Sequence, residues 1–385
     1  MDLEDLVRTK KVIVCVGSGG VGKTTLSAAI ALEAAELGLT VCVLTIDPAR
    51  RLANAMGLDS LGNVATRVPP DRFEAAGIPV PPGQLWAMML DTKRTWDDLV
   101  MRFAADEAQA RRILDNHYYQ QISSAIAGSQ EFMAMEKLYE LHESGAYDVV
   151  VLDTPPTRHA LDFLDAPKKM MGFMDEAVLQ MLMAPGRLGL SLFKNSGAWM
   201  FAALQRITGF TVLREIADFV DSFSGMHAGF RERAAKVEAL LRANRSTFVL
   251  ITSPNPPTID EATYFQRKLV EYRMPWAGFV VNRVHERALA EPGAKDAWER
   301  MRQDPAGILR RLDMPADPDF AARVVENLDR VEALARRDAA QLDRLTRACP
   351  GYPRLTVPAF DADVHDLSGL TRINRYLFPG PRRET

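Results

Sequence analysis

The residues from Gly17 to Thr24 read Gly-Ser-Gly-Gly-Val-Gly-Lys-Thr and fit the Walker A pattern of phosphate-binding loops, G-x-x-x-x-G-K-[ST]. In such a loop the glycines let backbone N–H groups surround phosphate oxygens, helped by the positive end of the following helix dipole. The Lys23 ammonium is expected to reach the β- and γ-phosphates of ATP, and the Thr24 hydroxyl to coordinate Mg²⁺. The alternative, a glycine-rich turn without function, does not explain why the loop lies between a predicted strand and a predicted helix. We therefore predict that the nucleotide is bound by Gly17, Gly19, Gly20, Val21, Gly22, Lys23, Thr24 and Thr25.

Two carboxylates follow predicted strands and add further chemistry. Asp47 ends an apolar run, a position from which it could orient the attacking water or sense the γ-phosphate; a turn or helix-cap residue is the alternative. Asp153 ends another such run, which is the Walker B arrangement, where the carboxylate binds Mg²⁺ directly or through water; a structural strand-end aspartate is the alternative. The sequence thus predicts Lys23 and Asp47 as catalytic residues, and Thr24 and Asp153 as ligands of Mg²⁺.

A parallel sheet is needed to bring these groups together. Short, nearly continuous apolar runs occur at 11–16, 40–46, 84–90, 147–152, 246–252, 276–281 and 355–357. Such runs are typical of strands covered by helices on both faces. Residues 24–37 carry apolar side chains at helical spacing directly after the glycines. We predict an α/β fold with a doubly wound, mostly parallel sheet of about six to eight strands.

Two long helical stretches interrupt the alternation of strands and helices. They span 92–145 and 166–243, whereas connections inside compact α/β units are usually about two to six residues long. We predict that they are helical insertions in a single ATPase domain of residues 1–385 and together form a client- or partner-binding subdomain. Residues 380–385 are expected to be a loose tail. A further helical and highly charged region spans 286–347.

Composition excludes several classes of protein. The chain is 47% hydrophobic and 25% charged, with a formal net charge of −3, so it lacks the basic excess expected of a nucleic-acid-binding protein. The apolar stretches at 177–193 and 197–213 are interrupted by Pro, Arg and Gln, whereas a membrane span needs about 20 apolar residues. We expect a cytoplasmic protein that binds no nucleic acid and does not itself cross a membrane.

The three motifs together resemble those of the ArsA-type ATPases, which include the arsenite-pump ATPase and the tail-anchored-protein targeting ATPases. Asp47-Pro48-Ala49 resembles the first switch of that family, and the twelve residues from Asp153, D-T-P-P-T-R-H-A-L-D-F-L, resemble the second, D-T-[AP]-P-T-G-H-T-L-R-x-L. The resemblance covers most of the chain and is greatest to bacterial members such as the paired mycobacterial ArsA-like ATPases. It implies a P-loop NTPase of the deviant Walker A class that hydrolyses ATP with Mg²⁺. It also implies adenine contacts by Asn282 and Pro358, and a homodimer or a heterodimer with a paralogue.

The sequence also departs from the family. The family loop usually reads G-K-G-G-V-G-K-[ST], and its first lysine reaches across a dimer interface to the partner's nucleotide. Ser18 occupies this position here, and Arg50, Arg51 or Arg158 are candidate replacements for the missing charge. The cysteines at 15, 42 and 349 are too scattered for the family's arsenite site or its zinc-binding CxxC, so we expect neither.

Residues 168–223 offer the strongest indication of a partner. They are rich in methionine, and flexible methionine side chains suit varied apolar partners, although methionines more often fill an ordinary core. In the targeting branch of the family, a helical subdomain in this place binds the transmembrane helix of a client. The sequence therefore favours a dimeric switch that binds and releases a hydrophobic peptide or membrane-protein client. The alternatives are the energising subunit of an anion or envelope transport system, and a nucleotide-dependent scaffold with weak turnover.

Overall fold

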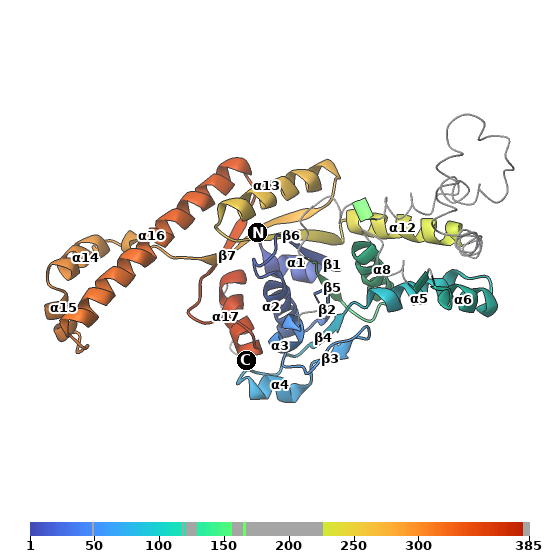
Figure 1. Ribbon diagram of the computed structural model, residues 1–385, viewed down its shortest axis with the longest axis horizontal. Coiled ribbons are helices and arrows are strands. Elements are labelled where there is room, and N and C mark those ends of the chain that lie inside the picture. The colour runs from blue at the N-terminus through green and yellow to red at the C-terminus, as the bar shows by residue number, and fades with distance from the viewer. Residues whose placement is uncertain (48–49, 118, 121–128, 156–164, 167–225, 380–385) are drawn as a thin grey trace, which may run out of the picture.

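A single mixed sheet organises the molecule (Figure 1). The computed structural model describes residues 1–47, 50–117, 119–120, 129–155, 165–166 and 226–379. The strand order is β3-β4-β2-β5-β1-β6-β7-β8. The strands are β1 Val12–Val16, β2 Thr40–Thr45, β3 Thr66–Arg67, β4 Gln84–Met89, β5 Val149–Asp153, β6 Ser246–Thr252, β7 Trp276–Val284 and β8 Arg354–Pro358.

All seven predicted strands are present, and the predicted doubly wound α/β fold is confirmed. The sequence did not predict β3, a two-residue strand that pairs antiparallel with β4 at the edge of the sheet. Two residues are too few to produce an alternating pattern. The other pairings in the described residues are parallel.

Helices cover both faces of the sheet, which explains why its strands are continuously apolar. Alternate residues of β1 point to opposite faces, so that Val14 belongs to one buried cluster and Ile13 to the other. The Val14 face is covered by α5 Thr92–Phe103, α8 Ser129–Glu143, α12 His227–Arg242 and α13 Pro256–Glu271. The Ile13 face is covered by α1 Leu3–Thr9, α2 Lys23–Glu36, α3 Arg51–Ala55, α4 Pro70–Ala75 and α17 Leu367–Leu377.

The two predicted helical insertions are only partly described. Helices α5, α6 (Glu107–Leu114) and α8 lie between β4 and β5, and α12 precedes β6. The methionine-rich residues 168–223, Arg158, and the tail at 380–385 lie outside the described residues. The assignment of the two insertions to a client- or partner-binding subdomain, and of 380–385 to a loose tail, therefore stays a prediction.

A helical arm extends from the end of β7, on the side of the molecule opposite α5 and α6 (Figure 1). It contains the 3₁₀ helix η1 Ala288–Ala290 and the helices α14 Ala294–Gln303, α15 Pro305–Arg311 and α16 Pro318–Ala348. The arm has its own small core around Trp298, Met301, Leu309 and Ala321. The sequence predicted charged helices here but not a separate arm, because an amphipathic helix has the same pattern whether it packs on a sheet or on another helix.

None of the helices in the described parts of the chain is long and apolar enough to span a bilayer.

Candidate active site

The predicted catalytic groups meet at the carboxyl ends of three adjacent strands, β2, β5 and β1. Asp47 follows β2, Asp153 is the last residue of β5, and the phosphate loop joins β1 to α2. Ligands of open α/β sheets bind at this edge of the sheet. The helix begins at Lys23, directly after Gly22, and its first turn contains no acidic residue that would oppose an anion.

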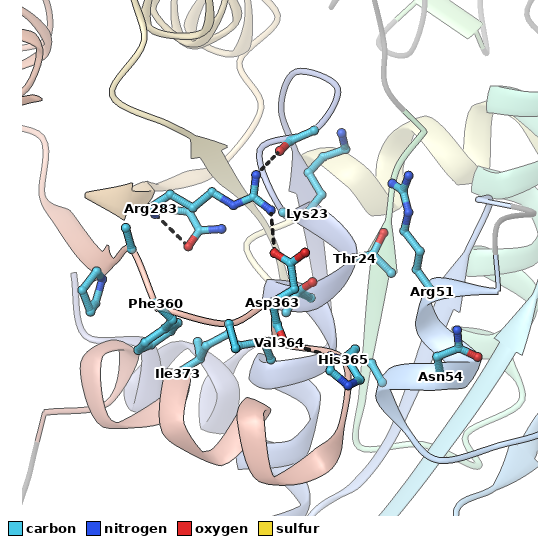
Figure 2. A pocket seen from close by; sticks show the side chains of 18 of the residues that line it. Lys23, Thr24, Arg51, Asn54, Arg283, Phe360, Asp363, Val364, His365 and Ile373 are labelled. Atoms are coloured by element: carbon cyan, nitrogen blue, oxygen red, sulfur yellow. Dashed lines mark hydrogen bonds and ion pairs between the residues drawn. The ribbon is translucent and has the colours of Figure 1, made fainter. Parts of the chain in front are cut away.

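A cavity of about 780 Å³ opens over this edge. Among the predicted site residues it is lined by Gly20, Gly22, Lys23, Thr24, Thr25, Asp47, Asn282 and Pro358. Figure 2 shows Lys23 and Thr24 at its centre, with Arg51 and Asn54 on one side and Arg283 on the other. Four other predicted residues do not line it: Val21 and Asp153 are buried, Gly17 packs against β6, and Gly19 is exposed.

Asp153 is held below the cavity by two hydroxyl groups. Its Oδ2 accepts hydrogen bonds from Thr24 Oγ1 and Thr45 Oγ1, each at 2.7 Å. Its Oδ1 is buried and has no hydrogen-bond partner among the described residues. Burial raises the pKa of this carboxyl from 3.8 to about 6, although the two hydroxyls and the Lys23 ammonium act in the opposite direction.

This arrangement fits a hard cation. Mg²⁺ prefers oxygen ligands and usually keeps several waters, and a buried carboxylate oxygen without a partner needs such a neighbour. The Thr24 hydroxyl would coordinate Mg²⁺ directly, and Asp153 would do so directly or through water.

Lys23 lies inside the curve of the phosphate loop. Its ammonium donates a hydrogen bond of 2.8 Å to the carbonyl oxygen of Ser18, and the side chain is buried. Burial lowers the pKa of Lys23, while the carboxylates of Asp153 and Asp47 raise it. A phosphate oxygen is a stronger partner for this ammonium than a neutral carbonyl, because both groups are then charged.

Asp47 faces the cavity beside one of the candidate cations. Its Oδ2 lies 3.4 Å from the guanidinium of Arg51, which also lines the cavity. Arg50 lines a smaller neighbouring cavity of about 140 Å³ instead. The structure thus brings Arg51 to the cavity that contains Lys23, whereas Arg158 lies outside the described residues.

Asn282 also contacts the phosphate loop, an interaction that the sequence did not predict. Its side-chain amide donates a hydrogen bond of 2.9 Å to the carbonyl oxygen of Val21, and its Oδ1 accepts one of 3.0 Å from the Arg283 backbone. Gly22 makes room for this contact, since a Cβ there would lie 2.3 Å from the Asn282 amide nitrogen. Asn282 therefore stabilises the loop in addition to lining the cavity.

Comparison with known proteins identifies the family. Residues 10–306 match the model of the family described as anion-transporting ATPase. The chain belongs to this ArsA-type ATPase family. It is an ATPase, since it has both the family match and the phosphate loop of the family.

Curated relatives agree with this assignment. The chain is 32% identical over 160 residues to the ATPase GET3 of Malassezia globosa, a match that covers 42% of this chain and 43% of the relative. It is 27% identical over 279 residues to the ATPase get3 of Aspergillus terreus, covering 72% and 74% respectively. It is 31% identical over 192 residues to a putative arsenical pump-driving ATPase of Halobacterium salinarum, covering 48% and 28%. The chain thus spans less than half of the Malassezia and Halobacterium relatives.

Several site residues of this ATPase were not predicted. Arg283 donates to the Gly20 carbonyl at 3.5 Å and lies 3.8 Å from the Asp363 carboxylate, as the dashed lines in Figure 2 show. His285 lies in the cavity wall, as does the loop before α17. The Ser18 hydroxyl donates a hydrogen bond to the Glu261 carboxylate on α13. Arg283 could have been inferred from its position beside Asn282, but no local pattern singles out the other residues.

A substitution at Gly17 would show how tightly the phosphate loop of this ATPase is packed. A Cβ at this position would lie 2.0 Å from the backbone carbonyl oxygen of Ile251. Because backbone cannot move away as a side chain can, we expect Gly17→Ala to lower the free energy of unfolding by about 2 kcal/mol or more. Urea unfolding measures the effect. Gly62→Ala is the matched control, since its Cβ meets nothing within 4 Å; equal stability of the two variants would contradict the observed packing.

Proposed function

We propose that this ATPase binds and hydrolyses Mg²⁺-ATP in the cavity, and that it works as a dimeric switch whose nucleotide state controls the binding of a hydrophobic client or membrane partner. The observation that carries the nucleotide chemistry is the Asp153 carboxylate, which bonds Thr24 and keeps one buried oxygen without a partner. The dimer, the client and a cytoplasmic location are supported by the resemblance to the targeting branch and by the methionine-rich segment.

Each group has a distinct part in the proposed reaction. The loop amides and the Lys23 ammonium bind the phosphates and stabilise the charge that develops on the transferred phosphoryl group. Mg²⁺ held by Thr24 and Asp153 would supply further neutralisation of the phosphate charge. The Asp47 carboxylate orients a water molecule for attack and accepts a hydrogen bond from it. Arg51, the first residue of α3, pairs with the Asp47 carboxylate and would hold it in position for this step.

An Asp47→Asn variant tests the proposal as a whole. We expect turnover to fall by about a hundredfold or more, because a neutral amide oxygen accepts a much weaker hydrogen bond from the attacking water than a carboxylate does. The ATP-bound form should then accumulate, and purification from the native lysate with Mg²⁺-ATP should retain proteins that bear an exposed apolar segment, which ADP should release. Co-purified proteins are identified by mass spectrometry.

The control is Asp148→Asn, which changes an exposed aspartate at the opposite end of β5, where its side chain accepts a hydrogen bond from the Thr40 backbone. It should hydrolyse ATP at the parental rate and retain no client in an ATP-dependent way. The switch proposal fails if the Asp47 variant retains the same proteins with ATP and with ADP.

The same experiment examines a second function. The family description, and the name of the Halobacterium relative, favour an energising subunit of a transport system. Recovery of one integral membrane protein in a fixed ratio, rather than varied clients, would support this second function.

A further inference from the structure

His285 is held at the cavity wall by a carboxylate from the helical arm. It follows the last residue of β7, and its Nδ1 lies 2.7 Å from the Oδ2 of Asp338 on α16. The His285 backbone N–H donates a second hydrogen bond of 3.0 Å to the same oxygen. Asp338 is fully buried, whereas the His285 side chain is 31% exposed and lines the cavity. The buried carboxylate therefore fixes both the backbone and the ring of His285.

The contact also determines which nitrogen of the ring carries the proton. When the carboxylate is ionised it only accepts hydrogen bonds, so Nδ1 is the donor, and when the ring carries a single proton Nε2 has a free lone pair. The other carboxylate oxygen of Asp338 is occupied by the guanidinium of Arg337, 3.3 Å away. Nε2 has no hydrogen bond among the described residues. The wall of the cavity thus contains an acceptor with a fixed direction.

This acceptor lines the same cavity as the two predicted adenine contacts, Asn282 and Pro358. Asn282 lies three residues before it on the same segment. Val284 pairs with Pro358, and its carbonyl oxygen accepts a hydrogen bond of 3.0 Å from the Ala359 backbone. His285 therefore directly follows the end of β7, where this strand pairs with the last residue of β8, Pro358.

Adenine and guanine differ in the group that they would present here. Adenine carries an exocyclic amino group, which donates hydrogen bonds, and guanine carries a carbonyl oxygen at the same position, which only accepts. A neutral Nε2 acceptor matches the first and repels the second.

We propose that His285 accepts a hydrogen bond from the adenine amino group through Nε2, and that Asp338 is the positioning residue that makes this ring select ATP over GTP. The inference rests on the proposed binding of ATP in this cavity. It adds that His285 and Asp338 select the base, and Asp338 belongs to the helical arm.

Calorimetric titration of the full chain with Mg²⁺-ATP and with Mg²⁺-GTP tests the inference. We expect the parent to prefer ATP, and His285→Ala to weaken ATP binding roughly tenfold with little change for GTP. In Asp338→Asn the amide oxygen is needed by the Arg337 guanidinium, so the amide NH2 takes the place of Oδ2. It then donates to Nδ1 and moves the ring proton to Nε2, with loss of the hydrogen bond from the His285 backbone. ATP should then bind more weakly and GTP more tightly, so that the ratio of the two affinities falls by roughly tenfold or more. For ATP hydrolysis, KM should rise while kcat is unchanged, because the base contact is the same in the ground state and the transition state.

Asp329→Asn is the matched control on the same helix. Its carboxylate accepts a hydrogen bond from the Trp298 indole and pairs with Arg302, away from the cavity. It should leave the ratio of ATP to GTP affinity at the parental value. Because His285 is partly exposed, His285→Ala decides the matter if Asp338→Asn does not fold.

The outcomes separate this inference from the proposed function. A parent that binds ATP, with a ratio that stays unchanged in both site variants, overturns the inference alone. Equal weakening of ATP and GTP also overturns it, because the ring would then contact the ribose or phosphates rather than the base. A folded parent that binds neither nucleotide overturns the proposed function and the inference with it.

Discussion

Replacing Lys23 with methionine is expected to reduce ATP turnover by about a hundred- to a thousandfold at saturating Mg²⁺-ATP. The ammonium lies inside the phosphate loop, 2.8 Å from the Ser18 carbonyl oxygen and close to the carboxylates of Asp47 and Asp153. Methionine has a similar length but carries no charge, so the loop keeps its packing and loses the group that stabilises the transferred phosphoryl. Steady-state release of phosphate measures the effect.

Lys236→Met controls for the loss of a positive charge. Lys236 lies on the exposed surface of α12 and pairs with Glu232 one turn away. This variant should hydrolyse ATP at the parental rate and unfold at the parental urea concentration. Parental turnover in the folded Lys23→Met protein would show that the cavity over the phosphate loop is not the place of hydrolysis.

Local sequence was sufficient to predict that these groups lie at one edge of the sheet, because each of them follows a strand. The phosphate loop, Asp47 and Asp153 each come directly after an apolar run, and parallel strands bring their carboxyl ends to one edge. The order of the strands then decides that these three segments are neighbours. That order was not predicted from the sequence.

The contacts that surround the centre could not be predicted in the same way. Ser18 bonds Glu261, 243 residues away, and Asn282 bonds Val21, 261 residues away. His285 finds its carboxylate 53 residues later, on a helix of the arm. Which residues form such long-range contacts depends on the tertiary packing. Neither the residue types nor the periodicity of the sequence indicates the partners. The same reason explains why Ser18 was recognised only as a missing lysine, and not as the partner of α13.

Replacing Asp153 with asparagine is expected to stabilise the fold while abolishing Mg²⁺-dependent hydrolysis. Burial raises the pKa of this carboxyl from 3.8 to about 6, so the folded protein holds a charged group in an unfavourable place at neutral pH. The shift corresponds to at most about 3 kcal/mol, at about 1.4 kcal/mol for each pKa unit. Asparagine has nearly the same shape, and its oxygen can still accept hydrogen bonds from Thr24 and Thr45, without the charge.

The pH dependence gives this prediction a definite sign. Because the folded protein binds the Asp153 proton more tightly than the unfolded chain does, the destabilisation is complete above pH of about 6 and disappears below about 3.8. The advantage of Asp153→Asn in free energy of unfolding should therefore be largest at pH 7 and shrink as the pH falls through this interval. Urea unfolding of both proteins without nucleotide or Mg²⁺, at pH 7 and about pH 4, measures it, with Asp148→Asn as the control for an exposed aspartate.

A buried charge that destabilises the fold is retained where the function of the protein requires it. At Asp153 that function would be to hold the cation beside Thr24, so adding Mg²⁺ with a non-hydrolysable ATP analogue should stabilise the parent protein and give the Asn variant much less stabilisation. The two proteins should then exchange their order of stability. An Asn variant that is less stable than the parent without ligands at pH 7, or that gains as much as the parent from Mg²⁺ and the analogue, would mean that Asp153 is a structural strand-end residue after all.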